Sequence, residues 1–213
     1  MNEYFQIPKT IPCYACIWMH GLGASGQDMR MIAEAMPFNH DKLLRHVFLD
    51  APKRPISVNQ GMVMPAWYDI YGMKITDRDD EGGIKASTQL IHETINALQT
   101  QGFQSEKIYL AGFSQGGAMA FYAALTYAKP LAGAIALSGY LPMADKVILK
   151  QPATLPIYVG YGRYDSIVMP AWTQETVLFL KENNYKNITV EDYPIDHSVC
   201  PEEIVAFTSW MTR

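Results

Sequence analysis

The sequence predicts a single α/β domain in which a mostly parallel sheet is covered by helices on both faces. Apolar runs of strand length alternate with helix-length segments along the 213 residues, as in strands joined by helical crossovers. Several polar residues with catalytic chemistry follow such runs directly, where the carboxyl ends of parallel strands form ligand sites. A chain of this length can bury a large core within one domain.

The composition excludes several classes of protein. Hydrophobic residues make up 49% of the chain and charged residues 18%, which is typical of globular proteins. The net charge is −4 and the basic residues are not clustered, so nucleic acid is not an expected partner. No segment reaches the apolar length of a membrane span, and the N-terminal residues do not resemble a secretory signal. With an odd number of cysteines, we expect a cytoplasmic protein without integral membrane association.

The first predicted strand covers residues 13–19 and ends at His20-Gly21-Leu22-Gly23. Glycines behind a strand let backbone N–H groups turn toward an anion, although a tight turn without a ligand gives the same pattern. His20 stands before the turn and is expected to be a structural hydrogen-bonding residue. A helix is predicted over residues 27–36, where apolar residues recur at helical spacing.

A second strand is predicted over residues 43–49, and residues 53–83 then lack sustained periodicity. This long segment is too rich in methionine and aromatic residues to be disordered, and long loops in compact domains are usually functional. We expect an ordered excursion over the edge of the sheet. Its apolar side chains are equally consistent with lining a pocket and with covering the core. Residues 84–100 follow as a helix with a broad apolar stripe.

The centre of the prediction is a strand, a sharp turn and a helix. Residues 108–111 form the strand, the turn reads Gly112-Phe113-Ser114-Gln115-Gly116, and a helix of small residues starts at residue 117. A turn this tight strains its central residue and needs residues without side chains on either side, as Gly112 and Gly116 provide. The helix N-terminus favours negative charge beside Ser114. Ser114 is therefore the candidate nucleophile, and the alternative is a glycine-rich turn that happens to hold a serine.

Three further strands and two further helices complete the alternation. The strands are predicted over residues 133–137, 155–159 and 188–193, and the helices over residues 171–183 and from residue 201 onward. An early proline and acids in the first turn mark the start of the last helix. Asp165 lies just past the second of these strands, and His197 lies in the loop after the third.

A nucleophilic serine needs a base, an acid that orients the base, and donors for an oxyanion. Ser114, Asp165 and His197 all follow strand ends, as does Leu22, so we expect them at one edge of the sheet. The chain order serine, acid, histidine is the one that such sheets use. Ser114 would attack an acyl carbonyl, His197 would carry the proton and Asp165 would orient the imidazole. The backbone N–H groups of Leu22 and Gln115 would bind the oxyanion.

Other acids and a second serine are weaker candidates. Asp145 falls in a polar loop, and Asp192 falls within a predicted strand. Asp196 is adjacent to His197, and adjacent side chains rarely point at each other in the required geometry. Ser138 lacks the flanking turn and is expected to be structural.

No metal and no cofactor is predicted. Three other histidines show no ligand spacing: His40, His46 and His92. Cys13 and Cys16 form a C-x-x-C, but they fall within a strand-like run and are expected to be small buried hydrophobic residues.

Together these motifs resemble the phospholipase/carboxylesterase family of α/β-hydrolases, which includes the acyl-protein thioesterases. The matching segments follow in order along nearly the whole chain: His20-Gly21-Leu22-Gly23, Met64-Pro65-Ala66-Trp67-Tyr68-Asp69, Asp80-Glu81-Gly82-Gly83-Ile84, Gly112-Phe113-Ser114-Gln115-Gly116-Gly117, Leu137-Ser138-Gly139-Tyr140-Leu141-Pro142 and His197-Ser198-Val199-Cys200-Pro201-Glu202-Glu203. The resemblance implies an α/β-hydrolase fold without a large cap domain. It also implies cofactor-free hydrolysis of carboxylic esters or thioesters.

In that family the positions of Ser114, Asp165 and His197 form the catalytic triad, and the segment around Met64 and Trp67 borders an acyl-binding groove. The oxyanion donors are the two amides named above. The chain departs from the family pattern in three ways. An alanine replaces the usual aspartate after His-Gly-Leu-Gly, a tyrosine replaces the usual histidine before residue 162, and the stretch from residue 165 to residue 170 is one residue longer. We therefore expect the oxyanion turn to be held differently.

The main hypothesis is a serine carboxylesterase that hydrolyses short- to medium-chain acyl esters through an acyl-enzyme intermediate. An acyl-protein thioesterase or a lysophospholipase would use the same residues with a longer apolar groove. The non-enzyme alternative is a catalytically silent ligand-binding module on the same fold. A homodimer formed through apolar surface near Trp172 or the excursion is compatible with each of these.

Overall fold

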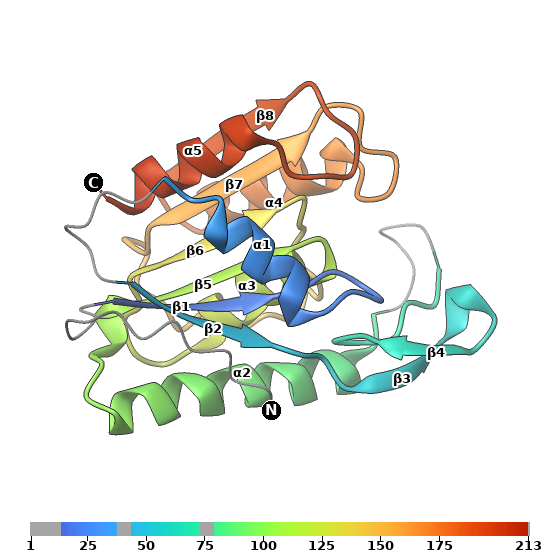
Figure 1. Cartoon of the computed structure of the whole chain (residues 1–213), viewed down its shortest axis with the longest axis horizontal. Helices are drawn as coiled ribbons and strands as arrows, with labels where there is room; N and C mark the ends of the chain where they lie inside the picture. The colour runs from blue at the N-terminus through green and yellow to red at the C-terminus, as the bar shows by residue number, and fades with distance from the viewer. Residues whose placement is uncertain (1–13, 38–43, 73–78, 213) are drawn as a thin grey trace.

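The fold is organised around a six-stranded sheet in which all neighbouring strands are parallel (Figure 1). The computed structural model describes residues 14–37, 44–72 and 79–212. In spatial order the strands are β2 (Leu44–Leu49), β1 (Tyr14–Met19), β5 (Ile108–Phe113), β6 (Gly133–Leu137), β7 (Ile157–Gly162) and β8 (Ile188–Tyr193). The chain adds β2 on one side of β1 and β5 on the other, which makes the carboxyl ends of β1 and β5 a topological switch point.

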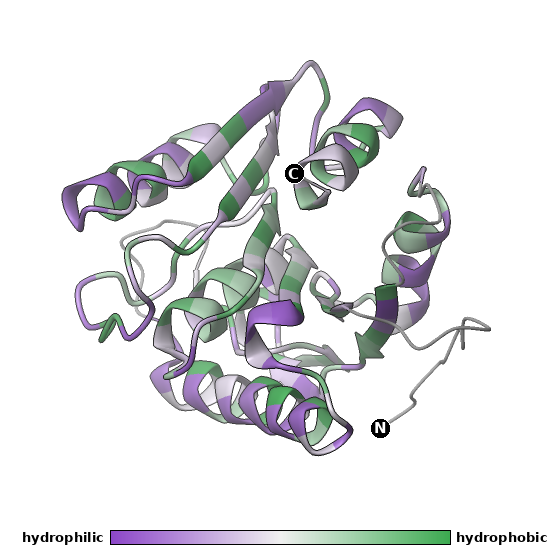
Figure 2. Ribbon diagram, turned by 90° about the vertical axis from the view of Figure 1, so that its left-hand side faces the viewer, coloured by the Kyte–Doolittle hydropathy of each residue, from purple (hydrophilic) through white to green (hydrophobic). Residues whose placement is uncertain are grey.

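Helices cover both faces of the sheet, as predicted. One face carries α1 (Gly26–Glu34) and α5 (Pro201–Met211), and the other carries α2 (Glu81–Thr100), α3 (Gln115–Thr126) and α4 (Pro170–Glu182). Alternate residues of β1 divide in the same way. Ala15, Ile17 and Met19 join the core with α2 and α3, whereas Cys16 and Trp18 join the core with α1 and α5. Figure 2 shows hydrophobic and hydrophilic residues alternating along α2 at the bottom of the view, as expected for an amphipathic helix on the sheet.

The excursion after β2 is ordered, as predicted, but it contains an antiparallel hairpin that the sequence analysis missed. Strands β3 (Lys53–Ile56) and β4 (Met62–Pro65) pair around the short 3-10 helix η1 (Ser57–Asn59). Each strand has only four residues and carries a proline, so neither the length nor the residue types favour a strand. The hairpin lies beyond the carboxyl end of β2 (Figure 1).

Several element boundaries also differ from prediction. Strand β7 extends to Gly162 because its last residues pair with the end of β8. Helix α2 begins at Glu81 because the Asp80 carboxylate caps it, accepting a hydrogen bond of 3.0 Å from the Gly83 amide. A second 3-10 helix, η2 (Ser105–Lys107), leads into β5. The predictions for Cys13 and His40 fall outside the described residues.

Within the described ranges, no large cap domain covers the sheet, and none of the helices combines the length and hydropathy that a bilayer span requires.

Candidate active site

The turn between β5 and α3 holds Ser114 in a strained backbone conformation. Its φ is 57° and its ψ is −121°, a combination that non-glycine residues rarely adopt. A Cβ at Gly112 would clash with the Gly116 carbonyl, and a Cβ at Gly116 would clash with the Met19 carbonyl of β1. The Ser114 amide donates a 2.9 Å hydrogen bond to the Leu137 carbonyl at the end of β6. Backbone contacts with β1 and β6 therefore fix the serine where three strands end.

The structure brings Ser114, His197 and Asp165 together in a continuous hydrogen-bonded path. His197 Nε2 lies 2.8 Å from Ser114 Oγ, and His197 Nδ1 lies 2.7 Å from Asp165 Oδ2. Because an ionised carboxylate only accepts hydrogen bonds, Nδ1 carries the imidazole proton and Nε2 accepts from the serine hydroxyl. The three residues come from the ends of β5, β7 and β8.

The Asp165 carboxylate accepts hydrogen bonds at both of its oxygens. Its side chain has no exposed surface, and Oδ1 accepts hydrogen bonds of 2.9 Å from the amides of Ile167 and Val168. The His197 side chain is 20% exposed, and its ring lies on Phe113 with centroids 4.8 Å apart. The Asp165 carboxylate is thus shielded from solvent, whereas the His197 imidazole is partly exposed.

Gln115 is held through its side chain, a feature that the sequence analysis did not single out. Its Oε1 accepts a 2.9 Å hydrogen bond from the Trp67 amide, and its Nε2 donates a 2.8 Å hydrogen bond to the Tyr68 carbonyl. Gln115 is also the first residue of α3, where the leading amides have no carbonyl partner within the helix. The excursion thereby fixes the residue whose amide is the predicted oxyanion donor. The sequence carries no local signal for these contacts, because they depend on the burial of Gln115 against the excursion.

The turn that carries Leu22 passes directly beside the nucleophile. A Cβ added at Gly21 would come within 3.3 Å of the Ser114 Cβ. Gly23 adopts a φ of 75° and donates a 2.8 Å hydrogen bond from its amide to the Pro65 carbonyl at the end of β4. The excursion therefore supports both predicted oxyanion residues, Leu22 through this turn and Gln115 through its side chain.

His20 is a structural residue, as predicted. It has no exposed surface, and its Nε2 accepts a 3.0 Å hydrogen bond from the Ala51 amide. Its Nδ1 therefore carries the proton and donates to the Gly21 carbonyl at 2.7 Å. Burial lowers the pKa of His20 despite this hydrogen bond and the Asp50 charge, which both raise it. The neutral imidazole thus fixes the start of the Leu22 turn.

One prediction about apolar surface needs correction. Trp67 has no exposed surface, because its indole lies in the core and donates a 2.8 Å hydrogen bond to the His20 carbonyl. It supports the site from beneath and does not line an open groove. Trp172 itself is buried, packed edge-on against Tyr140. Ile167 and Met169, which precede it in the chain, are 48% and 45% exposed, so self-association through apolar surface near Trp172 remains a prediction. Met64 is half-buried next to Gly23 and remains the predicted groove residue.

The rival residues lie away from this path. Asp145, Asp192 and Asp196 are all exposed, and Asp192 forms an ion pair with Arg163. Ser138 is buried, and its hydroxyl makes no hydrogen bond within the described ranges.

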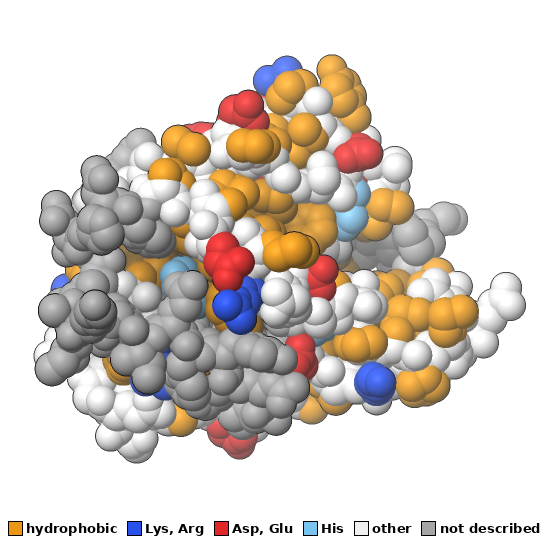
Figure 3. Space-filling model, in the orientation of Figure 1, with side chains coloured by type: hydrophobic (Ala, Val, Ile, Leu, Met, Phe, Trp, Pro, Cys, Tyr) orange, Lys and Arg blue, Asp and Glu red, His pale blue; other side chains and the backbone are white. Residues whose placement is uncertain are grey.

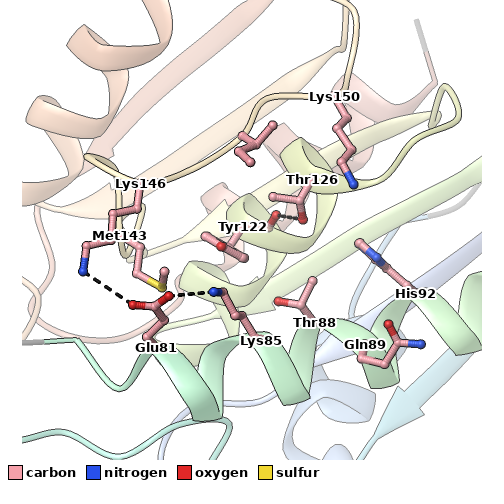
Figure 4. Close-up of a pocket in the computed structure, with 11 residues that line it drawn as sticks. Glu81, Lys85, Thr88, Gln89, His92, Tyr122, Thr126, Met143, Lys146 and Lys150 are labelled. Atoms are coloured by element: carbon pink, nitrogen blue, oxygen red, sulfur yellow. Dashed lines mark hydrogen bonds and ion pairs between the residues drawn. The ribbon is translucent and has the colours of Figure 1, made fainter.

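A separate hollow of about 270 Å³ lies between α2, α3 and the loop after β6 (Figure 4). Glu81 forms ion pairs with both Lys85, at 2.6 Å, and Lys146, at 3.5 Å, across its mouth. None of the predicted site residues lines it. A search of the described residues finds no group of His, Cys, Asp and Glu side chains that could hold a metal ion.

Comparison with known proteins identifies the family of the chain. The family profile described as Phospholipase/Carboxylesterase matches residues 6–212. The chain belongs to the phospholipase/carboxylesterase family. It is 35% identical over 212 residues to acyl-protein thioesterase 1 of Schizosaccharomyces pombe, covering 97% of this chain and 93% of the relative. It is 33% identical to a probable carboxylesterase of Oryza sativa, covering 92% and 75%. The crystal structure of Zea mays acyl-protein thioesterase 2 matches with a TM-score of 0.88 at 26% identity, covering 99% of this chain and 97% of that one.

These matches confirm the resemblance and the α/β-hydrolase fold. The structure also describes the places where the chain departs from the family pattern. After Ala24, the Ser25 amide donates to the Asp28 carboxylate at 2.9 Å, which anchors the start of α1. Tyr161 is buried in β7. The longer stretch after Asp165 supplies the two amides that bind its carboxylate.

Proposed function

We propose that the protein is a serine hydrolase that cleaves acyl esters through an acyl-enzyme on Ser114, with short- to medium-chain carboxylic esters as the first substrates to test. The observation that carries the proposal is the hydrogen-bonded path from Ser114 through His197 to the buried Asp165 carboxylate. The strained turn, the neighbouring helix N-terminus and the family membership support the same chemistry.

In the first half-reaction, Ser114 Oγ attacks the substrate carbonyl carbon while His197 Nε2 accepts the hydroxyl proton. The oxyanion of the tetrahedral intermediate accepts hydrogen bonds from the amides of Leu22 and Gln115, each worth on the order of 3 kcal/mol of barrier. His197 then protonates the departing alkoxide or thiolate, which leaves the acyl group on Ser114. Asp165 stays ionised and stabilises the imidazolium.

In the second half-reaction, a water molecule attacks the acyl-enzyme while His197 accepts one of its protons. Collapse of the second tetrahedral intermediate releases the carboxylic acid and returns that proton to Ser114 Oγ. The His197 side chain is 20% exposed, so solvent water reaches part of the imidazole. The cycle needs no cofactor.

The experiment is a series of p-nitrophenyl esters of increasing acyl length, assayed with the wild type and with Ser114→Ala. We expect turnover by the wild type and none above background by the variant. Equal activity of the two proteins would reject the proposal. A folded wild type that hydrolyses no ester or thioester would favour the silent binding module.

Acyl-protein thioesterase activity is the second candidate, since relatives with that name match nearly the whole chain. An exposed apolar surface supports it. Met62 and Val63 are 64% and 63% exposed on β4, next to Met64, and hydrophobic side chains gather over the hairpin in Figure 3. A palmitoylated peptide assayed beside the ester series separates the two candidates. A sharp optimum at short chains would count against the thioesterase and against a lysophospholipase.

The same hairpin surface and the exposed Ile167 and Met169 near Trp172 are the two candidate surfaces for the predicted homodimer, which mass determination by light scattering tests. The cytoplasm stays the predicted compartment.

A further inference from the structure

The first turn of α5 buries a carboxyl group that the proposed chemistry does not use. Glu203 is 1% exposed, and neither of its carboxyl oxygens makes a hydrogen bond within the described part of the chain. Burial of an unpaired carboxylate is costly, so such groups are rare unless they are neutral or have a role.

The Glu203 carboxyl packs directly on β7, the strand that leads to Asp165. A Cβ at Gly160 of β7 would clash with Glu203 Oε1. Gly162 lies two residues further along and therefore presents the same face. A Cβ at Gly162 would clash with the Asp196 carbonyl, directly before His197. Because Gly160 has no side chain, α5 packs closely on β7 at that position. Because Gly162 has none, the His197 loop packs closely on β7 two residues further along.

This packing joins the elements that carry the acid and the base. Asp165 lies just after β7, and His197 lies in the loop between β8 and α5. On the β8 side, the loops are tied by a 3.0 Å hydrogen bond from the Tyr164 amide to the Ile195 carbonyl. On the α5 side, the contact between Glu203 and Gly160 sets how closely the helix approaches β7.

The surroundings of Glu203 favour its neutral form. Burial raises the pKa of this carboxyl to about 8; the nearby Cys200 amide opposes the shift, without forming a hydrogen bond of good geometry, and the Glu191 carboxylate adds to it. Among the described residues, the other titratable groups that face it are the hydroxyls of Tyr158 on β7 and Tyr193 on β8 and the thiol of Cys200 just before α5. These hydroxyls lie 2.8 Å apart, and that of Tyr193 donates to Glu191 at 2.6 Å.

We propose that Glu203 is a positioning residue whose neutral carboxyl holds α5 and the His197 loop against β7, so that the imidazole stays aligned between Ser114 and Asp165. Ionisation brings an unpaired charge into this contact. The helix and the loop then move away from the strand to hydrate it, and the alignment is lost. The kinetic test of this inference rests on the proposed function.

The first test compares the wild type with Glu203→Gln, which is neutral at every pH, and with Glu202→Gln, a matched control at the exposed neighbouring position. kcat and KM for one p-nitrophenyl ester are measured from about pH 6 to about pH 9.5. We expect the wild type and Glu202→Gln to lose kcat about tenfold above about pH 8, with KM nearly constant. Glu203→Gln keeps its kcat from pH 7 into this range. An alkaline loss in Glu203→Gln equal to that of the wild type would overturn the proposal, as would a wild type without any loss.

Glu203→Leu provides a second neutral side chain of similar size in case the glutamine variant does not fold. The same result is expected, with no alkaline loss of kcat, and the same loss as in the wild type would overturn the proposal.

A spectroscopic readout separates this inference from the proposed function. The proton in an imidazole–carboxylate hydrogen bond resonates far downfield in proton NMR, and it reports the alignment of His197 Nδ1 with Asp165 whether or not the protein turns over substrate. We expect this signal to fade in the wild type above about pH 8 and to persist in Glu203→Gln. Fading at the same pH in both proteins would overturn the positioning role. Absence of all esterase and thioesterase turnover, with the expected NMR result, would reject only the proposed function.

Discussion

The two halves of the candidate active site are held by different kinds of contact. The nucleophile half lies at the centre of the sheet, where Ser114 is fixed by glycine-mediated backbone contacts to β1 and β6. The base half lies on β7 and β8 at the edge of the sheet. Gly162 also lets the His197 loop pack against β7, but the alignment of His197 with Asp165 depends on side-chain hydrogen bonds. Strand β8 buries only Tyr193 among its six residues. The nucleophile half should therefore fail abruptly on substitution, whereas the base half should respond in a graded way to substitution and pH.

The largest expected effect is that of Ser114→Ala. Removal of a nucleophilic serine from such a triad lowers kcat by about 10⁶-fold. The variant should nearly keep the thermal unfolding temperature of the wild type, because the substitution removes a single hydroxyl and leaves the backbone contacts of the turn in place. Steady-state kinetics on one ester and a thermal scan check both statements. A loss of less than about tenfold would contradict the role of Ser114.

Asp165→Asn should have the next largest effect, a loss of about 10⁴-fold in kcat, because an amide at this position favours the wrong imidazole tautomer. The matched control is Asp196→Asn, since Asp196 is exposed and adjacent to His197. It should change kcat by less than about threefold. A larger loss of kcat in Asp196→Asn than in Asp165→Asn would indicate that Asp196 is the acid of the triad.

The glycine contacts of the nucleophile half can be tested through stability. Gly116→Ala should lower the free energy of unfolding by about 3 kcal/mol, because the added methyl group clashes with the rigid Met19 carbonyl. Gly82→Ala is the control, since its Cβ would meet nothing closer than 3.7 Å, and it should raise stability by up to about 1 kcal/mol in helix α2. Chemical denaturation measures both. Equal stability of the two variants would show that the approach of α3 to β1 is not tight.

The packing of the edge strand β2 should make the free energy of unfolding depend on pH in the acid range. Burial lowers the pKa of His46 on β2 to about 4, and its Nδ1 accepts a 3.0 Å hydrogen bond from the Trp18 indole. Because the unfolded chain binds the proton more tightly, stability is full above the unfolded pKa of 6.5 and falls as the pH drops toward about 4. The loss is on the order of 3 kcal/mol. Denaturation at several pH values should show this slope in the wild type and its reduction in His46→Gln. An unchanged slope would assign the acid sensitivity to other groups.

The smallest expected effect concerns the side-chain contacts of Gln115. Gln115→Met leaves the backbone donor in place but removes both hydrogen bonds to the excursion, at the Trp67 amide and the Tyr68 carbonyl. kcat should fall about tenfold with KM nearly constant, because the oxyanion donor is less well oriented. Gln89→Met, at an exposed position of α2, is the control. A rise in KM alone would indicate that the side chain serves substrate binding instead.

The same difference between the two halves explains what the sequence could predict. The β5–α3 turn is encoded by neighbouring residues, because Gly112 and Gly116 flank Ser114 at the two positions where a tight strand-to-helix turn leaves no room for a side chain. The positions of Asp165 and His197 followed from the strand ends and from the chain order. The burial of Trp67 and the contacts of Gln115 arise between segments far apart in sequence, so no local pattern encodes them. The two hairpin strands are close in sequence, but their four-residue length and their prolines conceal the pairing. Glu203 looked like an ordinary acid in a helical first turn, and only its packing on Gly160 shows that it is buried.

The most direct measurement for the central claim is mass mapping of the protein after reaction with a fluorophosphonate, which forms a stable adduct with an activated serine. The account predicts a single adduct on the peptide containing Ser114. The adduct should be absent in Ser114→Ala and should form at least about 100-fold more slowly in His197→Gln. An adduct on another residue, or an undiminished labelling rate in His197→Gln, would contradict the account.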